Sequence, residues 1–129
     1  MHRDQSPLSA MPLDTTICRI QEVIDIRCDI NTLLVTVKDT DSGQETIVEF
    51  VEVEGFRVLD EGDLLEFWPA CSNSWLYKIT AGGWLEQECL RPGFVARETK
   101  NVLEFFIAGV NACVSVISWS EPKVTARRL

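Results

Sequence analysis

The chain has a single histidine, His2, at the start of its 129 residues. A nucleophilic hydrolase needs a base beside its serine or cysteine, and that base is most often histidine. Zinc sites use clustered His and Cys ligands at short spacing, and the sequence has no Cys-x-x-Cys pair. The shortage of histidine therefore argues against the common hydrolases and against zinc, and we expect neither a metal nor a cofactor.

Motifs for phosphates and calcium are also missing. The sequence contains no Gly-x-x-x-x-Gly-Lys loop, no Gly-x-Gly-x-x-Gly turn and no His-Glu-x-x-His segment. Residues 60–63, Asp-Glu-Gly-Asp, lack the ligand alternation and the closing glutamate of a calcium loop. We interpret them as a solvated acidic turn.

Long apolar runs are absent as well. The longest, Phe105 to Val110, is far shorter than the roughly 18 residues that cross a bilayer. Residues 1–12 lack the apolar stretch of a secretory signal. The five cysteines are odd in number and most lie in apolar segments, which is typical of reduced thiols in the cytoplasm. We expect a cytoplasmic protein without a membrane segment, whose thiols are Cys18, Cys28, Cys71, Cys89 and Cys113.

Cations are few, since 12 Lys and Arg stand against 20 Asp and Glu, for a net charge of -8. Nucleic-acid binding depends on cations, so it is not expected. Most of the imbalance lies in residues 45–66, where eight acids accompany one base, Arg57. Such a field attracts basic surfaces, although it also suits ordinary solubility. The favoured hypothesis is a non-enzymatic binding or inhibitory module for a basic protein partner, like an immunity protein or antitoxin, with an acidic face of Glu52, Glu54, Asp60, Glu61, Asp63 and Glu66.

Apolar residues that alternate with period two dominate the remaining pattern. Glycines and prolines fall between these stretches, which are mostly six to nine residues long. The pattern predicts an all-β, mainly antiparallel domain of about seven or eight strands, arranged as a barrel or a sandwich. A short helical turn is expected over 57–62. The predicted strands include residues 33–38, 45–53, 64–68, 75–81, 84–90, 102–108 and 113–119.

Two segments receive a more specific interpretation. Gly82-Gly83 suits a two-residue hairpin turn, which predicts antiparallel pairing of 75–81 with 84–90 and a cross-strand pair of Trp75 with Trp84. Residues 16–28 fit either a strand or a helix capped by Asp14, and their β-branched residues favour the strand. The strand would direct inward Cys18, Ile20, Ile24, Ile26 and Cys28.

The expected domain organisation is a disordered lead-in over 1–12, one β domain over 13–122 and a short basic tail over 123–129. The alternative function is a small β-barrel that binds a small molecule, with weak catalysis by carboxylates. Glu86 and Glu88 would share one face of a strand, where an apolar setting could raise the pKa of one acid. They could equally form the polar side of a half-buried strand. The residues of the alternative site are Trp68, Trp75, Trp84, Glu86 and Glu88.

Overall fold

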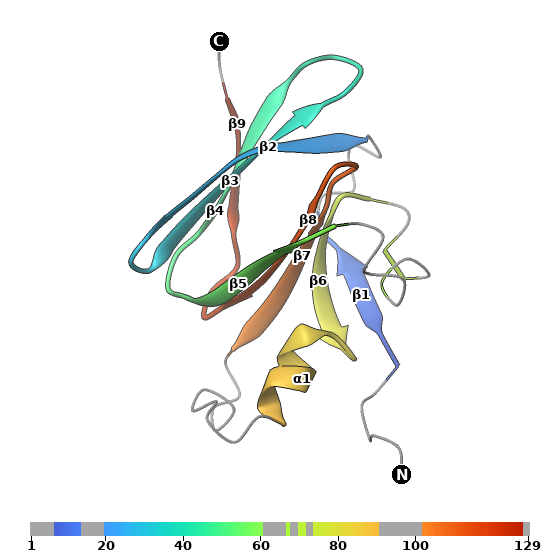
Figure 1. Cartoon of the computed structure of the whole chain (residues 1–129), viewed down its shortest axis with the longest axis vertical. Helices are drawn as coiled ribbons and strands as arrows, with labels where there is room; N and C mark the ends of the chain where they lie inside the picture. The colour runs from blue at the N-terminus through green and yellow to red at the C-terminus, as the bar shows by residue number, and fades with distance from the viewer. Residues whose placement is uncertain are drawn as a thin grey trace.

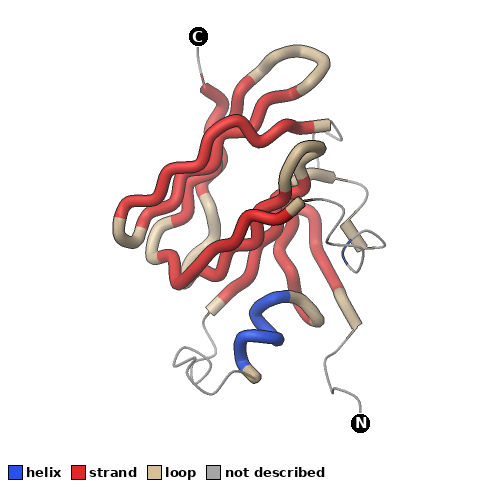
Figure 2. Tube along the Cα trace, in the orientation of Figure 1, coloured by secondary structure: helices blue, strands red, loops and turns tan. Residues whose placement is uncertain are grey.

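The computed structural model describes residues 7–13, 20–60, 67, 70–71, 74–90 and 102–127, and they form two antiparallel sheets and one short helix (Figures 1 and 2). The five-stranded sheet has the order β1 (Ser9–Pro12), β6 (Leu76–Ala81), β7 (Leu103–Ala108), β8 (Cys113–Ser118) and β5 (Val53–Leu59). The four-stranded sheet has the order β2 (Gln21–Asp29), β3 (Thr32–Asp39), β4 (Glu45–Phe50) and β9 (Lys123–Arg127).

The two sheets enclose the main core, so the predicted all-β, mainly antiparallel fold is confirmed in its sandwich form, with nine strands in the described part of the chain where about seven or eight were expected. Strand β3 turns Leu33, Val35 and Val37 inward, and each of them is fully buried. This follows from the period-two pattern, because alternate side chains of a strand share one face. Across the core, the rings of Phe50 and Phe105 meet at 5.6 Å between centroids.

The helix α1 (Trp84–Cys89) covers the outer face of the five-stranded sheet. Trp84, Leu85 and Cys89 are half-buried there against Val102 and Ile117. Strand β8 is therefore buried on both faces, which explains its continuous burial from end to end.

Asn111, in the turn between β7 and β8, fastens this turn to the edge of β2. Its Oδ1 accepts a hydrogen bond from the N–H of Val23 at 3.0 Å, and its Nδ2 donates to the carbonyl of Val23 at 2.8 Å. The N–H of Val110 donates to the carbonyl of Gln21 at 2.9 Å. The side-chain amide thus takes the place of a neighbouring strand at one corner of the sandwich.

The predicted Gly82-Gly83 hairpin is wrong. Gly82 does have a positive φ of 77°, but Gly83 is extended and leads into helix α1. The partners of β6 are β1 and β7. Trp75 and Trp84 consequently form no cross-strand pair, since Trp75 is buried between the two sheets and Trp84 begins helix α1 on the other face of the five-stranded sheet.

Two further predictions in the acidic segment need correction. The expected strand over 45–53 divides at Val51 and Glu52 into β4 and β5, which belong to different sheets. The division occurs where Glu52 has a positive φ of 55°. The helical turn expected over 57–62 is wrong at 57–59, which complete β5, and 61–62 lie outside the described residues. The strand expected over 64–68 lies outside them too, except for the buried Phe67.

The strand interpretation of 16–28 is confirmed over Gln21–Asp29, but its predicted inward face is wrong. A register shift between Val23 and Asp25 interrupts the alternation, so Val23 faces the core. Ile20 and Ile24 are exposed, and so is Cys28. Ile26 alone of the described set packs against the core. Asp14 and Cys18 lie outside the described residues.

Both ends of the chain contain strands where the sequence indicated a lead-in and a tail. Ser9–Pro12 form β1, which pairs with β6, and Lys123–Arg127 form β9, which pairs with β4. The described β structure therefore extends past the expected boundaries at residues 12 and 123.

Candidate functional site

The acidic segment 45–66 is distributed over both sheets. Glu45 and Glu49 lie on the outer face of β4, whereas Glu54 lies on β5. Glu52 occupies the turn between these strands, and Asp60 follows β5. Glu52, Glu54 and Asp60 are exposed, as an acidic face requires. Glu61, Asp63 and Glu66 lie outside the described residues.

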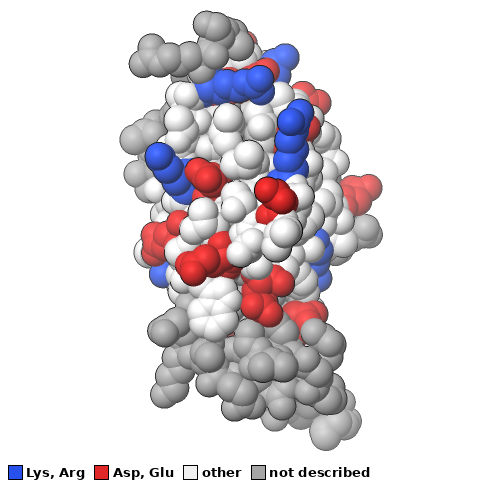
Figure 3. Space-filling view, turned by 90° about the vertical axis from the view of Figure 1, so that its left-hand side faces the viewer, with Lys and Arg blue, Asp and Glu red and all other residues white. Residues whose placement is uncertain are grey.

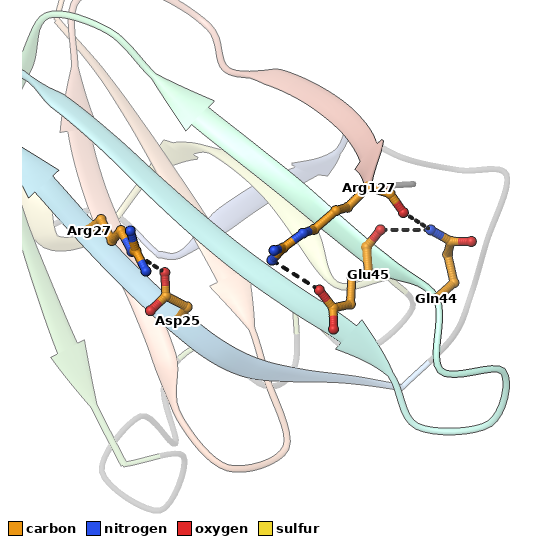
Figure 4. A network of polar contacts seen from close by, with 5 residues as sticks. All are labelled: Asp25, Arg27, Gln44, Glu45 and Arg127. Atoms are coloured by element: carbon orange, nitrogen blue, oxygen red, sulfur yellow. Dashed lines mark hydrogen bonds and ion pairs between the residues drawn. The ribbon is translucent and has the colours of Figure 1, made fainter. Parts of the chain in front are cut away.

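The basic end of the chain lies directly against part of this segment, because β9 pairs with β4. Arg127 Nη1 lies 3.2 Å from Glu45 Oε1, and Gln44 Nε2 donates to the carbonyls of Glu45 and Arg127 (Figure 4). Lys123 is the register partner of Glu49. Opposite charges on adjacent strands attract each other weakly in solvent. Of the acidic residues of β4, Glu45 is therefore ion-paired within the fold, and Glu49 lies opposite a basic residue.

An open groove of about 280 Å³ crosses the same outer face. Leu34, Thr36 and Ile47 line it between the guanidinium groups of Arg27 and Arg127. Arg27 is bonded to Asp25 at 3.0 Å, as Arg127 is to Glu45 (Figure 4). Because each guanidinium already has a carboxylate partner, this groove is a charge-balanced, solvated face.

Exposed carboxylates also gather at the opposite end of β3, where two turns meet. We define the acidic corner as the β2–β3 turn with its flanking Asp29, the β4–β5 turn, Glu54 and Trp119. Asn31 in the first turn accepts a hydrogen bond through its carbonyl from the N–H of Val53 at 3.0 Å. The two turns are therefore held side by side.

The C-terminal end of β8 fixes the second turn. The Ser118 hydroxyl donates to the carbonyl of Val51 at 2.9 Å, and the N–H of Trp119 donates to the carbonyl of Glu52 at 3.2 Å. The Trp119 indole Nε1 also donates to Glu54 Oε1 at 3.2 Å. In Figure 3, which faces this side of the molecule, Asp and Glu side chains gather below the middle of the described surface, whereas Lys and Arg lie mostly above them.

A second candidate is Glu104 on β7, which is 2% exposed. Its Oε2 accepts a hydrogen bond from the N–H of Trp84 and its Oε1 from the N–H of Leu85, both at 2.9 Å. Burial raises the pKa of Glu104 to about 7, against the two N–H groups and the positive charge of Arg57, which lower it. Glu86 raises it further. Glu104 was not among the predicted site residues, although a lone acid in the apolar stretch 102–108 was the available signal.

The neighbours of Glu104 are engaged with one another. The Arg57 guanidinium lies 5.0 Å from the centre of the Trp84 ring. The N–H of Gly82 donates to Glu86 Oε2 at 2.9 Å, and Trp84 Nε1 donates to Glu88 Oε2 at 3.1 Å. The prediction that Glu86 and Glu88 share a strand face is therefore wrong, because both lie on α1 and bond to groups at its N-terminal end.

The residues of the alternative site do not surround one common cavity. Glu86 and Glu104 line a pocket of about 170 Å³ on the outer face of the five-stranded sheet, whereas Trp75 lies on the inner face. Trp84 belongs to the helix above, and Trp68 lies outside the described residues. The sheet thus separates two of the aromatic residues that the sequence suggested would act together.

The cysteines resemble structural thiols more than reactive ones. Cys71 and Cys113 are buried, Cys89 is half-buried, and none of these or Cys28 is in a disulfide. Burial raises the pKa of Cys71 to about 12, with Glu104 adding to the shift, so this thiol is protonated at neutral pH. The predicted burial is wrong for Cys28, which is exposed at the end of β2.

Within the described ranges, no three His, Cys, Asp or Glu residues are grouped so as to hold a metal, and no helix has the length and apolar character needed to cross a membrane. Comparison of the chain with protein families, with curated proteins and with solved structures found no match.

Proposed function

We propose that the protein is a non-enzymatic binding module that presents the acidic corner to a basic protein partner, in the manner of an immunity protein or an antitoxin. The observation that carries this proposal is that hydrogen bonds fix the Glu54 carboxylate and the backbone of the turn that presents Glu52. Glu52 lies in a turn whose carbonyl is bonded to Trp119, and the Glu54 carboxylate is bonded to the Trp119 indole.

An ordered carboxylate beside a turn with a fixed backbone suits recognition more than catalysis. Groups that are already ordered lose less conformational entropy when a partner binds. Complementary charge at an interface also accelerates association, because the attraction acts before contact. In contrast, the buried Glu104 has a backbone N–H on each of its oxygens, so its carboxylate serves the start of α1. The thiols further support a reducing compartment, the cytoplasm.

The pocket beside Glu104 is the observation that favours the alternative, a small-molecule site. Its volume of about 170 Å³ is smaller than the volume of most ligand pockets, which is several hundred Å³. This function predicts a thermal shift with a small molecule that disappears on substitution of Leu85, which lines the pocket. The acidic corner predicts no such shift, so the two functions are separable.

The test of the binding function is an affinity purification from the source cell at low salt, followed by kinetics with the purified basic protein that it recovers. We expect the double variant Glu52→Lys with Glu54→Lys to associate at least tenfold more slowly at low ionic strength. The difference should shrink near 0.5 M salt, where screening shortens the field to a few ångströms.

The matched control is Asp41→Lys, which changes an exposed acid in the β3–β4 turn at the other end of the sheet. It should retain most of the association rate. Equal rates for the double variant and the unmodified protein at low salt would contradict the proposed function, and so would failure to recover any basic protein.

A further inference from the structure

The β2–β3 turn places an isoleucine where folding gains little from it. The Ile30 side chain is 93% exposed and therefore contributes almost no apolar burial. Its backbone φ is 28°, on the positive side that β-branched residues rarely adopt. Glycine or asparagine would suit a two-residue turn better. The stability of the fold thus does not account for isoleucine at this position.

The second turn repeats this feature. Within the described residues, the non-glycine residues with positive φ are Ile30 and Glu52, and they lie in the two turns that the bond from Val53 to Asn31 holds together. Val51, beside Glu52, is 41% exposed, and its carbonyl accepts hydrogen bonds from the hydroxyls of Ser118 and Ser120. Strained backbone persists where the surrounding structure fixes it, and it is concentrated at functional positions.

We propose that Ile30, with Val51 from the adjoining turn, is the apolar anchor of the acidic corner and inserts into an apolar pocket of the basic partner. This inference rests on the proposed function and names the residue that determines the lifetime of the complex. The charges around the anchor specify the partner, because Asp29, Glu52 and Glu54 are exposed acids that call for a rim of Lys and Arg around the pocket.

A second copy of the chain would be a poorer partner for the acidic corner, because of the same charges. Two acidic corners brought together would place like charges opposite each other, which opposes association. A basic surface with a central apolar pocket complements both the acidic residues of the corner and its apolar anchor. Buried apolar anchors within a polar rim mainly set dissociation rates, whereas rim charges mainly set association rates.

The first step of the test identifies the protein that touches the anchor. A photo-reactive p-benzoylphenylalanine is introduced at position 30 of the full chain, and at position 42 in the β3–β4 turn as a control. We expect a basic protein to cross-link at position 30 and not at position 42. Cross-linking to a second copy of the chain would overturn the assignment of the occupant.

The second step uses that protein, purified, in binding kinetics with Ile30→Gly and Ile30→Asn. Both variants relieve the positive φ, so their thermal midpoints should rise by a few degrees. Their complexes should nevertheless dissociate at least tenfold faster, with association changed less than twofold. Val110→Asn is the control, because Val110 is 44% exposed in the β7–β8 turn at the other end of β8. It should leave both rates unchanged.

A gain in stability combined with a loss of binding is the decisive result, since misfolding cannot produce it. If the Ile30 variants dissociate at the unmodified rate while the Glu52 and Glu54 double variant associates slowly, the anchor is refuted and the proposed function stands. If neither set of variants changes binding, both are refuted.

Discussion

Gly83 leaves room for the carboxylate of Glu104 and for no side chain of its own. A Cβ atom at position 83 would lie 2.7 Å from both carboxylate oxygens and 2.7 Å from Cγ2 of Ile79. The same oxygens accept the hydrogen bonds that begin helix α1. The glycine and the buried acid are therefore two parts of one junction between the helix and the five-stranded sheet.

This junction predicts a large effect of the smallest substitution. Gly83→Ala should destabilise the protein by about 1–3 kcal/mol, because a methyl group forced into a close-packed site must displace its neighbours. The measurement is the free energy of unfolding in urea. Gly55→Ala is the control, since its Cβ would meet Trp84 at an ordinary 3.7 Å. Equal losses for the two variants would show that the contact with Glu104 is unimportant.

Glu104 also predicts how stability depends on pH. Its pKa rises from 4.5 to about 7 in the folded protein, so the folded state binds the proton more tightly than the unfolded state does. The resulting stabilisation is fully present below about pH 4.5 and is lost as pH rises through about 7. A shift of this size corresponds to about 3 kcal/mol at most.

The measurement is the free energy of unfolding between pH 5 and 8, compared with that of Glu104→Gln. The variant should show a flatter dependence over this interval, whatever its absolute stability. Arg57 and Glu86 remain as the charged neighbours that influence Glu104, so any slope they contribute persists in the variant. An identical slope in both proteins would assign the pH dependence to other groups.

The sequence allowed strands to be predicted where local alternation decides the structure. Leu33, Val35 and Val37 share one face, with Thr36 and Lys38 on the other, and the strand there is confirmed. The hairpin predicted at Gly82-Gly83 is wrong because glycines permit both a hairpin and the entry to a helix. The choice depends on Glu104, about twenty residues away, and its position against Trp84 follows only from the packing of β7 beside β6.

The candidate site was predictable in part for a similar reason. Local composition indicated the acids at 52 and 54, and both are exposed. It could not reveal that β9 brings Arg127 to Glu45, because a pairing between strands 82 residues apart leaves no local signal. Nor could it reveal that Ile30 is 93% exposed at a positive φ, because local composition does not distinguish an exposed isoleucine in a turn from a buried one.

Asn111 provides a test of the corner where β2 meets the β7–β8 turn. Asn111→Ala should cost about 1–3 kcal/mol, because it leaves the N–H and the carbonyl of Val23 without the side chain that bonds both. Hydrogen exchange at the Val23 amide should accelerate. Asn111→Asp keeps the acceptor for the Val23 amide and loses the donor to its carbonyl. The exchange rate of that amide in Asn111→Asp should therefore lie between the rates in the unmodified protein and in Asn111→Ala. Unchanged exchange in the alanine variant would mean that solvent or another group replaces the side chain.

The cysteines should separate into fast and slow classes with a thiol reagent. Cys28 is exposed and should react in the native protein, whereas Cys71 and Cys113 are buried and should react only when the structure opens. The raised pKa of Cys71 adds to its protection, because the thiolate is the reactive form. Cys28→Ser should remove a fast phase at pH 7 and leave the slow reaction at the rate of unfolding. If Cys71 is modified as fast as Cys28, the Cys71 thiol is not buried against the outer face of the five-stranded sheet.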